Sequence, residues 1–345
     1  MPKTKALVLF SGGLDSIVAV KLLQKQNIET TGVCFYSAFY GCEKAEESAR
    51  NLGIDLITVD VSEEMLAIVK NPACGYGKNL NPCIDCHAMM IRRADALARE
   101  KEFSFIATGE VLGQRPFSQN KEALGRVQKL AGCDVLRPLS AKLLDETEIE
   151  KSGLVKRGLL ERISGRDRSE QMELAKRFQI GNYPSPAGGC LLTDPAYSER
   201  LGVLLEHWPD CNSEDADILK YGRVFWLNAI ISDKEKSEKI LVVVGRNQAE
   251  NEGLKRLAKR GDFMVELKGL NGPLTLVRTR SKKLIFDQDE LSLDIPKKLD
   301  LSHLDLSQEK TAAEIQKTAA LLTGMYSVKA RGSKNSSIKI INHKS

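Results

Sequence analysis

The sequence predicts an α/β domain with a mostly parallel sheet, followed by a smaller α+β domain. The length of 345 residues suits two domains of ordinary size. Up to about residue 200, short β-rich runs alternate with helical patterns, which is typical of βαβ units and a parallel sheet. Beyond that point, strand-like runs follow one another without long helices between them. We therefore expect domains at residues 1–200 and 201–345.

The first domain is expected to place a ligand site at the carboxyl ends of its strands. Crossovers between parallel strands are right-handed, and open parallel sheets bind ligands at that edge. Leu14, Ile17, Val18 and Leu22 have the spacing of one helix face. The predicted strands cover residues 6–10, 30–35, 55–61 and 103–108, and the predicted helices cover 14–22, 43–52 and 86–101.

The second domain is expected to contain mostly strands and one strong helix. The Ala and Leu spacing between residues 310 and 322 predicts that helix. The predicted strands cover residues 221–227, 239–244, 262–267, 274–278 and 336–341.

Composition excludes several classes of protein. Hydrophobic residues make up 42% and charged residues 28% of the chain, which is ordinary for a soluble globular protein. No run approaches 18 consecutive apolar residues, so we expect no membrane span and no membrane partner. The first residues lack the apolar region and cleavage site of a secretory signal, so we expect a cytoplasmic protein.

Positive charge is concentrated in the last third of the chain. The formal net charge is +5, from 51 basic and 46 acidic residues. Residues 326–345 contain five basic residues and no acidic one, and a second basic group consists of Arg278, Arg280, Lys282 and Lys283. This distribution favours a polyanionic partner there. Charge runs this short are equally typical of a solvated surface.

A glycine turn joins the first predicted strand to the first predicted helix. The segment 11–16 reads Ser-Gly-Gly-Leu-Asp-Ser. Two glycines let the backbone approach an anion, and the N–H groups at the helix start point at it. Asp15 would repel a phosphate unless a cation lay between them, so it implies Mg²⁺. The turn is neither a Walker loop nor a dinucleotide fingerprint.

The glycine turn resembles the signature of the PP-loop ATPases, Ser-Gly-Gly-x-Asp-Ser. These enzymes cleave ATP between the α and β phosphates, adenylate an oxygen of the substrate and release pyrophosphate. The resemblance implies a Rossmann-like domain in which Ser11, Gly12, Gly13 and Ser16 hold pyrophosphate, with Asp15 on its Mg²⁺. The alternative is a capped turn without a ligand.

A second segment resembles one subgroup of this family. Residues 107–114 read Ala-Thr-Gly-Glu-Val-Leu-Gly-Gln, similar to the Thr-Gly-Glu-Ser-Leu-Gly-Gln segment of 4-thiouridine synthases. Residues 136–139 match the Arg-Pro-Leu of that family, and the resemblance extends over about residues 5–195. We expect this chain to lack the N-terminal tRNA-binding modules and the C-terminal rhodanese domain of the bacterial synthases. We expect four further residues at the nucleotide: Phe35, Thr108, Gly109 and Gln114.

The chain has eight cysteines, which we expect to be thiols, metal ligands or catalysts but not structural disulfides. Five show no ligand-like pairing, and most of these are expected to be small buried side chains: Cys34, Cys42, Cys74, Cys133 and Cys211. Cys83 and Cys86 form a CxxC pair at a predicted helix start, where the dipole stabilises thiolates. Cys190 follows a loop with two glycines and two prolines, so we expect it to be accessible.

Several interpretations of Cys83, Cys86 and Cys190 compete. The three could ligate a 4Fe–4S cluster with one open iron able to carry sulfide, an arrangement that resembles an iron–sulfur subgroup of tRNA thiolases. Cys190 and either Cys83 or Cys86 could form a persulfide pair without metal, or all three could form a structural zinc site together with His87. The run 83–87 also fits c-type haem attachment, which requires export. Buried unreactive cysteines are the plain alternative.

The C-terminal domain resembles the RNA-binding domain of NFACT proteins over about residues 205–345. The resemblance rests on Val-Gly-Arg-Asn at 244–247, on Asn251 and on the basic tail after Met325-Tyr326-Ser327. It implies a tRNA-binding function. The candidate phosphate contacts are Arg246, Arg278, Arg280, Lys282 and Lys283.

Together these features predict an ATP-dependent tRNA sulfurtransferase that releases AMP and pyrophosphate. A uridine carbonyl, favoured as C4 over C2, would be adenylated and then attacked by sulfur from a sulfide or persulfide donor. The catalytic residues would be Asp15, Cys83, Cys86 and Cys190. The alternatives are a PP-loop amidating ligase on a small substrate and a non-catalytic RNA-binding adaptor.

Overall fold

The computed structural model describes residues 3–184, 189–230, 237–281, 284, 286 and 289–343. The chain divides into two compact units, residues 1–198 and 199–345. Helix α8 (Pro195–His207) carries the chain from the first unit into the second.

The first unit is built on a four-stranded parallel sheet. Its strands are β1 (Lys5–Leu9), β2 (Glu29–Tyr36), β3 (Leu56–Asp60) and β4 (Phe105–Thr108). Their order is β3-β2-β1-β4, and every pairing is parallel. Leu9 at the end of β1 pairs with both Val33 and Thr108, so the loops after β1, β2 and β4 leave the sheet at one edge. The predicted parallel α/β class is confirmed.

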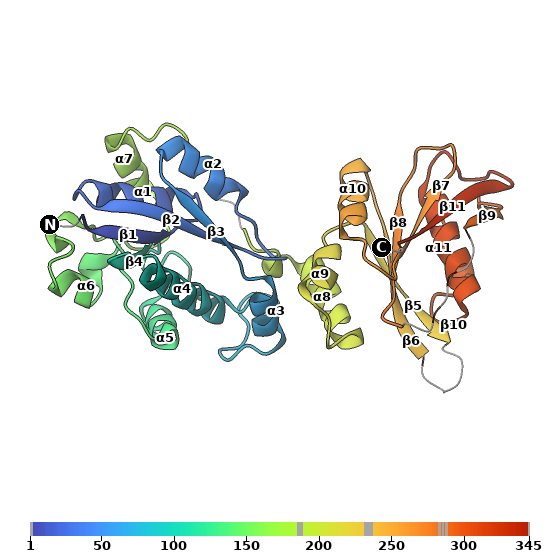
Figure 1. Cartoon of the computed structure of the whole chain (residues 1–345), viewed down its shortest axis with the longest axis horizontal. Coiled ribbons are helices and arrows are strands. Elements are labelled where there is room, and N and C mark those ends of the chain that lie inside the picture. Colours follow the sequence, from blue (N-terminus) through green and yellow to red (C-terminus); the bar gives the residue numbers. More distant parts are fainter. Residues whose placement is uncertain are drawn as a thin grey trace. The chain divides into compact units, whose positions relative to one another are not determined.

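Helices cover both faces of this sheet. Helices α1 (Leu14–Gln24) and α7 (Ser169–Arg177) lie on one side, and α4 (Cys83–Glu100) and α5 (Lys121–Ala131) lie on the other (Figure 1). The remaining helices of the unit are α2 (Glu43–Leu52), α3 (Ser62–Lys70) and α6 (Glu148–Lys151), with 3₁₀ turns at Ala141–Leu143, Arg157–Leu159 and Leu191–Thr193. Helix α4 begins three residues before the predicted start, so both CxxC cysteines lie in its first turn.

The second unit is α+β, as predicted. A seven-stranded sheet has the order β10-β5-β6-β8-β7-β11-β9. Its strands are β5 (Arg223–Ile230), β6 (Ser237–Val244), β7 (Phe263–Leu267), β8 (Thr275–Arg278), β9 (Glu290–Leu293), β10 (Glu309–Lys310) and β11 (Ser336–Asn342). The short strands β9 and β10 were not predicted. The helical elements are α9 (Ser213–Ile218), α10 (Gln248–Leu257), α11 (Ala312–Tyr326) and a 3₁₀ turn at Ser302–Leu304.

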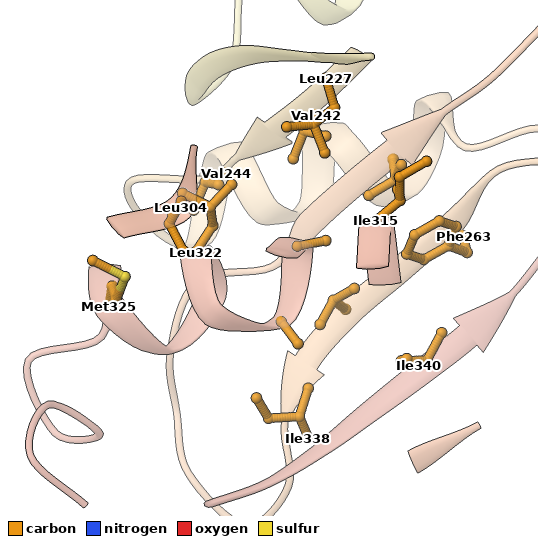
Figure 2. Close-up of a cluster of buried hydrophobic side chains, with 14 of the residues drawn as sticks. Leu227, Val242, Val244, Phe263, Leu304, Ile315, Leu322, Met325, Ile338 and Ile340 are labelled. Carbon is orange, nitrogen blue, oxygen red and sulfur yellow. The ribbon is translucent and has the colours of Figure 1, made fainter. Parts of the chain in front are cut away.

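The core of the second unit lies between α11 and the sheet. Ile315 and Leu322 of α11 are fully buried and belong to one apolar cluster with Val242, Phe263 and Ile340 (Figure 2). Thr311 caps the helix through a reciprocal pair of hydrogen bonds with Glu314, which satisfies N–H groups that the helix itself leaves free. Within the described parts of the chain, no helix is both long and apolar enough to cross a membrane.

A buried ionic network ties the strands of the second unit to α9. Arg278 is only 1% exposed, and its guanidinium lies 3.0 Å from Asp215 and 2.8 Å from Asp262. It also donates to the Leu257 carbonyl. Arg278 was predicted to contact RNA phosphate. That prediction is wrong, because the guanidinium is enclosed by two carboxylates of its own unit.

Replacing Arg278 with Ala should lower the free energy of unfolding by about 3 kcal/mol or more, because buried Asp262 would lose its main counter-charge and buried Asp215 one of its cationic partners. Urea denaturation of the full chain measures this change. The matched control is Arg260→Ala, which removes an exposed arginine from the same unit and should change stability by less than about 0.5 kcal/mol. Equal effects of the two substitutions would contradict a structural role for the network.

Candidate active site

The glycine turn is fixed by backbone packing against α2. Gly12 has φ +73°, and a Cβ built there would lie 2.3 Å from the Lys44 carbonyl oxygen. The Ser48 hydroxyl donates to the Gly12 carbonyl at 2.9 Å. No other residue type fits this position, because both the backbone conformation and the close approach exclude a side chain.

Helix α1 starts directly after the turn. Gly13 is its N-cap in extended conformation, and the Ser16 hydroxyl donates to the Gly13 carbonyl at 2.8 Å. Ser11 is exposed, and its Oγ lies 3.4 Å from the Gly13 nitrogen. The first N–H groups of a helix have no partner within the helix, so this terminus offers donors and a favourable dipole to an anion.

The end of β4 passes closely over the first turn of α1. A Cβ at Gly109 would lie 2.6 Å from the Ser16 backbone nitrogen, so only glycine allows this contact. Thr108 is buried, and its hydroxyl donates to Glu110 at 3.2 Å. Phe35 is buried in β2, opposite Val59 of β3.

Asp15 combines one held and one unsatisfied carboxylate oxygen. Its Oδ2 accepts a hydrogen bond from Gln114 Nε2 at 3.0 Å and lies 3.9 Å from the Arg168 guanidinium. Its Oδ1 is buried and, within the described residues, has no hydrogen-bond partner. A buried carboxylate oxygen is normally paired, and hard cations such as Mg²⁺ prefer oxygen ligands. The residues present therefore fit a magnesium ion at Asp15.

The buried carboxylate of Glu110 connects two elements of the site. Glu110 contacts His87 Nδ1 at 2.8 Å and accepts from Arg137 Nε at 2.9 Å. Burial alone raises the pKa of Glu110, but the charge of Arg137 and the hydrogen bond from His87 outweigh burial and bring the pKa to about 2. Glu110 thereby joins the end of β4 to α4, on which His87 directly follows Cys86.

Cys83, Cys86 and Cys190 form one group, which we call the three-cysteine group. The pKa of Cys86 is raised by both Cys83 and Cys190, and Cys83 also raises the pKa of Cys190, so all three sulfurs interact. The Tyr40 hydroxyl lies 3.7 Å from Cys86 Sγ. The backbone after Cys190 is anchored where the Leu191 N–H donates to the Phe39 carbonyl at 3.0 Å.

The thiols of this group are held in their protonated form. Burial raises the pKa of Cys86 to about 12 and that of Cys190 to about 11. Burial also raises the pKa of Cys83, against the lowering effect of the Arg115 charge. We expected the start of α4 to stabilise thiolates, but loss of solvation outweighs the helix dipole here. Cys190 is half-buried, not freely accessible as expected.

The three-cysteine group fits an iron–sulfur cluster in donor type but not in spacing. Cysteine thiolates are the usual cluster ligands. Across the segments that the structure describes, however, no set of three or more His, Cys, Asp or Glu side chains is placed to hold a metal ion. We therefore derive no step through such a cluster.

One pair of cysteines departs from the expected free thiols. Cys34 at the end of β2 and Cys42 at the start of α2 form a disulfide, and both are 6% exposed. The expectation of no structural disulfide is wrong for this pair, because the turn between β2 and α2 brings the two Cβ atoms together. Cys211 is buried as expected, whereas Cys74 is exposed and Cys133 half-exposed.

Two of the remaining candidate RNA contacts, Arg246 and Arg280, have partners within their own unit. Arg246 lies at the end of β6 and pairs with Glu250 at 2.7 Å. Arg280 pairs with Asp215 at 2.8 Å, and its guanidinium lies 5.3 Å from the centre of the Trp208 ring. That these two arginines contact RNA remains a prediction. Lys282 and Lys283 lie outside the described residues.

Three residues at the site were not predicted from the sequence: Tyr40, Arg115 and Arg168. Arg168 reaches Asp15 from a segment that carries no recognisable motif. Arg115 directly follows Gln114, so its position beside a predicted nucleotide contact was the only signal. Tyr40 gave no signal, because its contact with Cys86 depends on the turn after β2.

Comparison with known proteins gives one family match, which lies within the first unit, and several partial matches to single proteins. Residues 2–154 match the family described as thiamine biosynthesis protein (ThiI). A probable tRNA sulfurtransferase of Thermococcus kodakarensis (strain ATCC BAA-918 / JCM 12380 / KOD1) is 33% identical over 154 residues, which are 42% of this chain and 39% of that protein. A probable tRNA sulfurtransferase of Geobacillus kaustophilus (strain HTA426) is 32% identical over 154 residues, 42% of this chain and 36% of that protein.

These matches leave much of each protein uncovered. The chain spans about two fifths of the length of these curated relatives. The family match ends at residue 154, before Cys190 and the second unit.

The crystal structure of a 4-thiouridine synthetase–RNA complex with bound ATP is 23% identical, with a TM-score of 0.38 and coverage of 63% of this chain and 52% of that chain. A predicted subunit of tRNA methyltransferase from Methanocaldococcus jannaschii has a TM-score of 0.34, 16% identity and coverage of 50% and 76%. At these low TM-scores neither structure bears on the function of this chain.

Glu110→Gln should destabilise the first unit in a pH-dependent way. The folded pKa of Glu110 is lowered from 4.5 to about 2, so its stabilisation is present above about pH 5 and is lost as the pH falls through 2. We expect a loss of about 3 kcal/mol at pH 7 that shrinks between pH 5 and pH 2. Urea titrations at several pH values measure it. The exposed control Glu122→Gln should cost under about 1 kcal/mol, and a pH-independent loss for Glu110→Gln would contradict an electrostatic origin of the stabilisation.

Proposed function

We propose that this chain is an ATP-dependent tRNA sulfurtransferase that adenylates a uridine carbonyl and replaces its oxygen with sulfur. One observation carries the proposal. The first unit contains both a glycine turn suited to bind an anion, next to the unpaired Oδ1 of Asp15, and the interacting thiols of the three-cysteine group. The names of the curated relatives support the same reaction over the first unit.

The first half-reaction uses the turn and Asp15. The turn and the start of α1 bind the phosphates of ATP, and Mg²⁺ at Asp15 Oδ1 would neutralise charge on the departing pyrophosphate. Gln114 holds the other carboxylate oxygen so that Oδ1 keeps its direction. The uridine oxygen attacks the α-phosphorus, the bond to the β-phosphate oxygen breaks, and an adenylated base forms.

The second half-reaction uses the three-cysteine group. A sulfur carried by these residues attacks the activated carbon, and AMP leaves. If the carrier is a cysteine persulfide, a second thiol breaks its S–S bond, and an external thiol must reduce the resulting disulfide. The sequence pattern of Cys83, Cys86 and Cys190 also favours a 4Fe–4S cluster, which would supply an open iron for sulfide once the three thiols moved to ligating distances that this structure does not show.

The second unit is proposed to bind the tRNA. A target base inside folded RNA must be unstacked to reach a pocket, which requires a grip on the surrounding backbone. The NFACT-like sequence pattern, the basic tail and the exposed side chain of Arg246 support this assignment. The preference for C4 over C2 of uridine rests on the similarity of residues 107–114 to 4-thiouridine synthases.

Two variants should separate the half-reactions. Asp15→Asn should lower tRNA-dependent AMP release by at least about 100-fold, because the cation loses its carboxylate. Cys190→Ala should abolish thiouridine formation, measured by mass spectrometry of digested tRNA, while ATP binding keeps the wild-type Kd. The control Cys133→Ala, outside the three-cysteine group, should retain both. Thiolation by Cys190→Ala would refute the sulfur role of Cys190.

Anaerobic purification should yield a protein with about four irons and a broad absorption band near 400 nm. Iron should fall to background in Cys86→Ala, because the cluster would lose a ligand, whereas Cys211→Ala should keep it. Iron and zinc are quantified by mass spectrometry. Zinc without iron would overturn the cluster assignment, and absence of both would leave the persulfide as carrier.

A further inference from the structure

One short loop connects the nucleotide turn to the three-cysteine group. At its start, Gln114 donates to Asp15 at 3.0 Å. At its end, the side chain of Ser118 is buried and interacts with the Cys83 thiol. Four peptide steps separate these residues, so their Cα atoms lie within about 15 Å of each other. We call residues 114–118 the bridging loop.

The bridging loop is anchored at its base. The Gly113 N–H donates to the Gln119 carbonyl at 2.6 Å, and the Gln119 N–H donates to the Arg115 carbonyl at 2.8 Å. Ser118 and Gln119 are 1% and 5% exposed. A loop closed by its own backbone hydrogen bonds and held by buried side chains presents its remaining side chains in fixed positions.

Three consecutive residues of the bridging loop are exposed, Arg115, Pro116 and Phe117, and two of them can recognise a nucleotide. Phe117 is 70% exposed, the highest value among the large hydrophobic residues described in the first unit. Arg115 is exposed and directly follows Gln114, whose side chain donates to Asp15. The described residues provide no ion pair for Arg115. An exposed aromatic ring beside an unpaired cation is the combination that binds unstacked bases and their phosphates.

We propose that Phe117 is the surface on which the target uracil stacks, and that Arg115 binds a phosphate of the same nucleotide. This inference rests on the proposed function and identifies the substrate subsite within it. The anchors of the loop explain the placement: the stacked base lies between Asp15, where it is activated, and Cys83, from whose group it receives sulfur. Phe117 touches the substrate but takes no part in bond making.

The first test measures binding without catalysis. Phe117→Trp provides a fluorescent ring at the stacking position, and its signal is taken as the difference from wild type, which contains Trp208 and Trp226. A single-stranded oligouridylate should quench this signal, whereas an abasic sugar-phosphate oligomer of equal length should not. Arg115→Ala should reduce the slope of log K against log salt by about one, because one phosphate contact is lost. Absence of quenching by the oligouridylate would overturn the stacking role.

The second test measures thiolation of unmodified tRNA transcripts. Phe117→Ala should lower the single-turnover rate by about 5- to 100-fold at unchanged Kd for ATP, the range for loss of one stacked base. Phe117→Tyr and Phe117→Trp should restore it to within about threefold, whereas Phe117→Leu should not, because it is apolar without a ring face. Leu159→Ala, which trims another exposed apolar side chain of the same unit, is the matched control.

The two tests separate failure of the subsite from failure of the reaction. A wild-type protein that forms no thiouridine refutes the proposed function, yet quenching of Phe117→Trp would still support base stacking. A wild-type protein that thiolates tRNA, together with a Phe117→Ala rate within twofold of wild type, would refute the subsite while the reaction stands.

Discussion

Two backbone contacts that only glycine permits hold the first unit's chemistry in place. Gly12 lies against the carbonyl of Lys44 at the start of α2, and Gly109 lies against the backbone of Ser16 at the start of α1. These contacts bring the ends of β1 and β4 to one helix terminus and direct the loop after β4 toward Asp15. A Cβ at either position would separate the anion site from the carboxylate that completes it, since neither facing backbone can move without its helix.

Burial also determines which side chains of the first unit are charged. The three-cysteine group has raised pKa values, so its sulfurs are not nucleophilic until a metal or a base removes their protons. Glu110, by contrast, keeps its negative charge in the interior because Arg137 and His87 pair with it. The unit thus holds protonated thiols near fixed charges, and protonated thiols react and oxidise more slowly than thiolates.

Local patterns predicted the parts of the molecule that depend on neighbouring residues. The glycine turn, its Asp15 and the helix after it follow from consecutive residues, and the alternation of strands and helices predicted the parallel sheet. Contacts between distant segments could not be predicted in this way. Arg278 resembled a surface cation until Asp215 and Asp262 were found around it, and the approach of Cys190 to Cys83 and Cys86 depends on packing across more than one hundred residues.

The disulfide between Cys34 and Cys42 adds a covalent crosslink to the turn between β2 and α2. The bond fixes the start of α2, which supports Gly12, and it closes the turn that carries Tyr40 to Cys86. Because both sulfurs are shielded from solvent, a dithiol reagent reaches this crosslink slowly, so the start of α2 stays fixed under mildly reducing conditions.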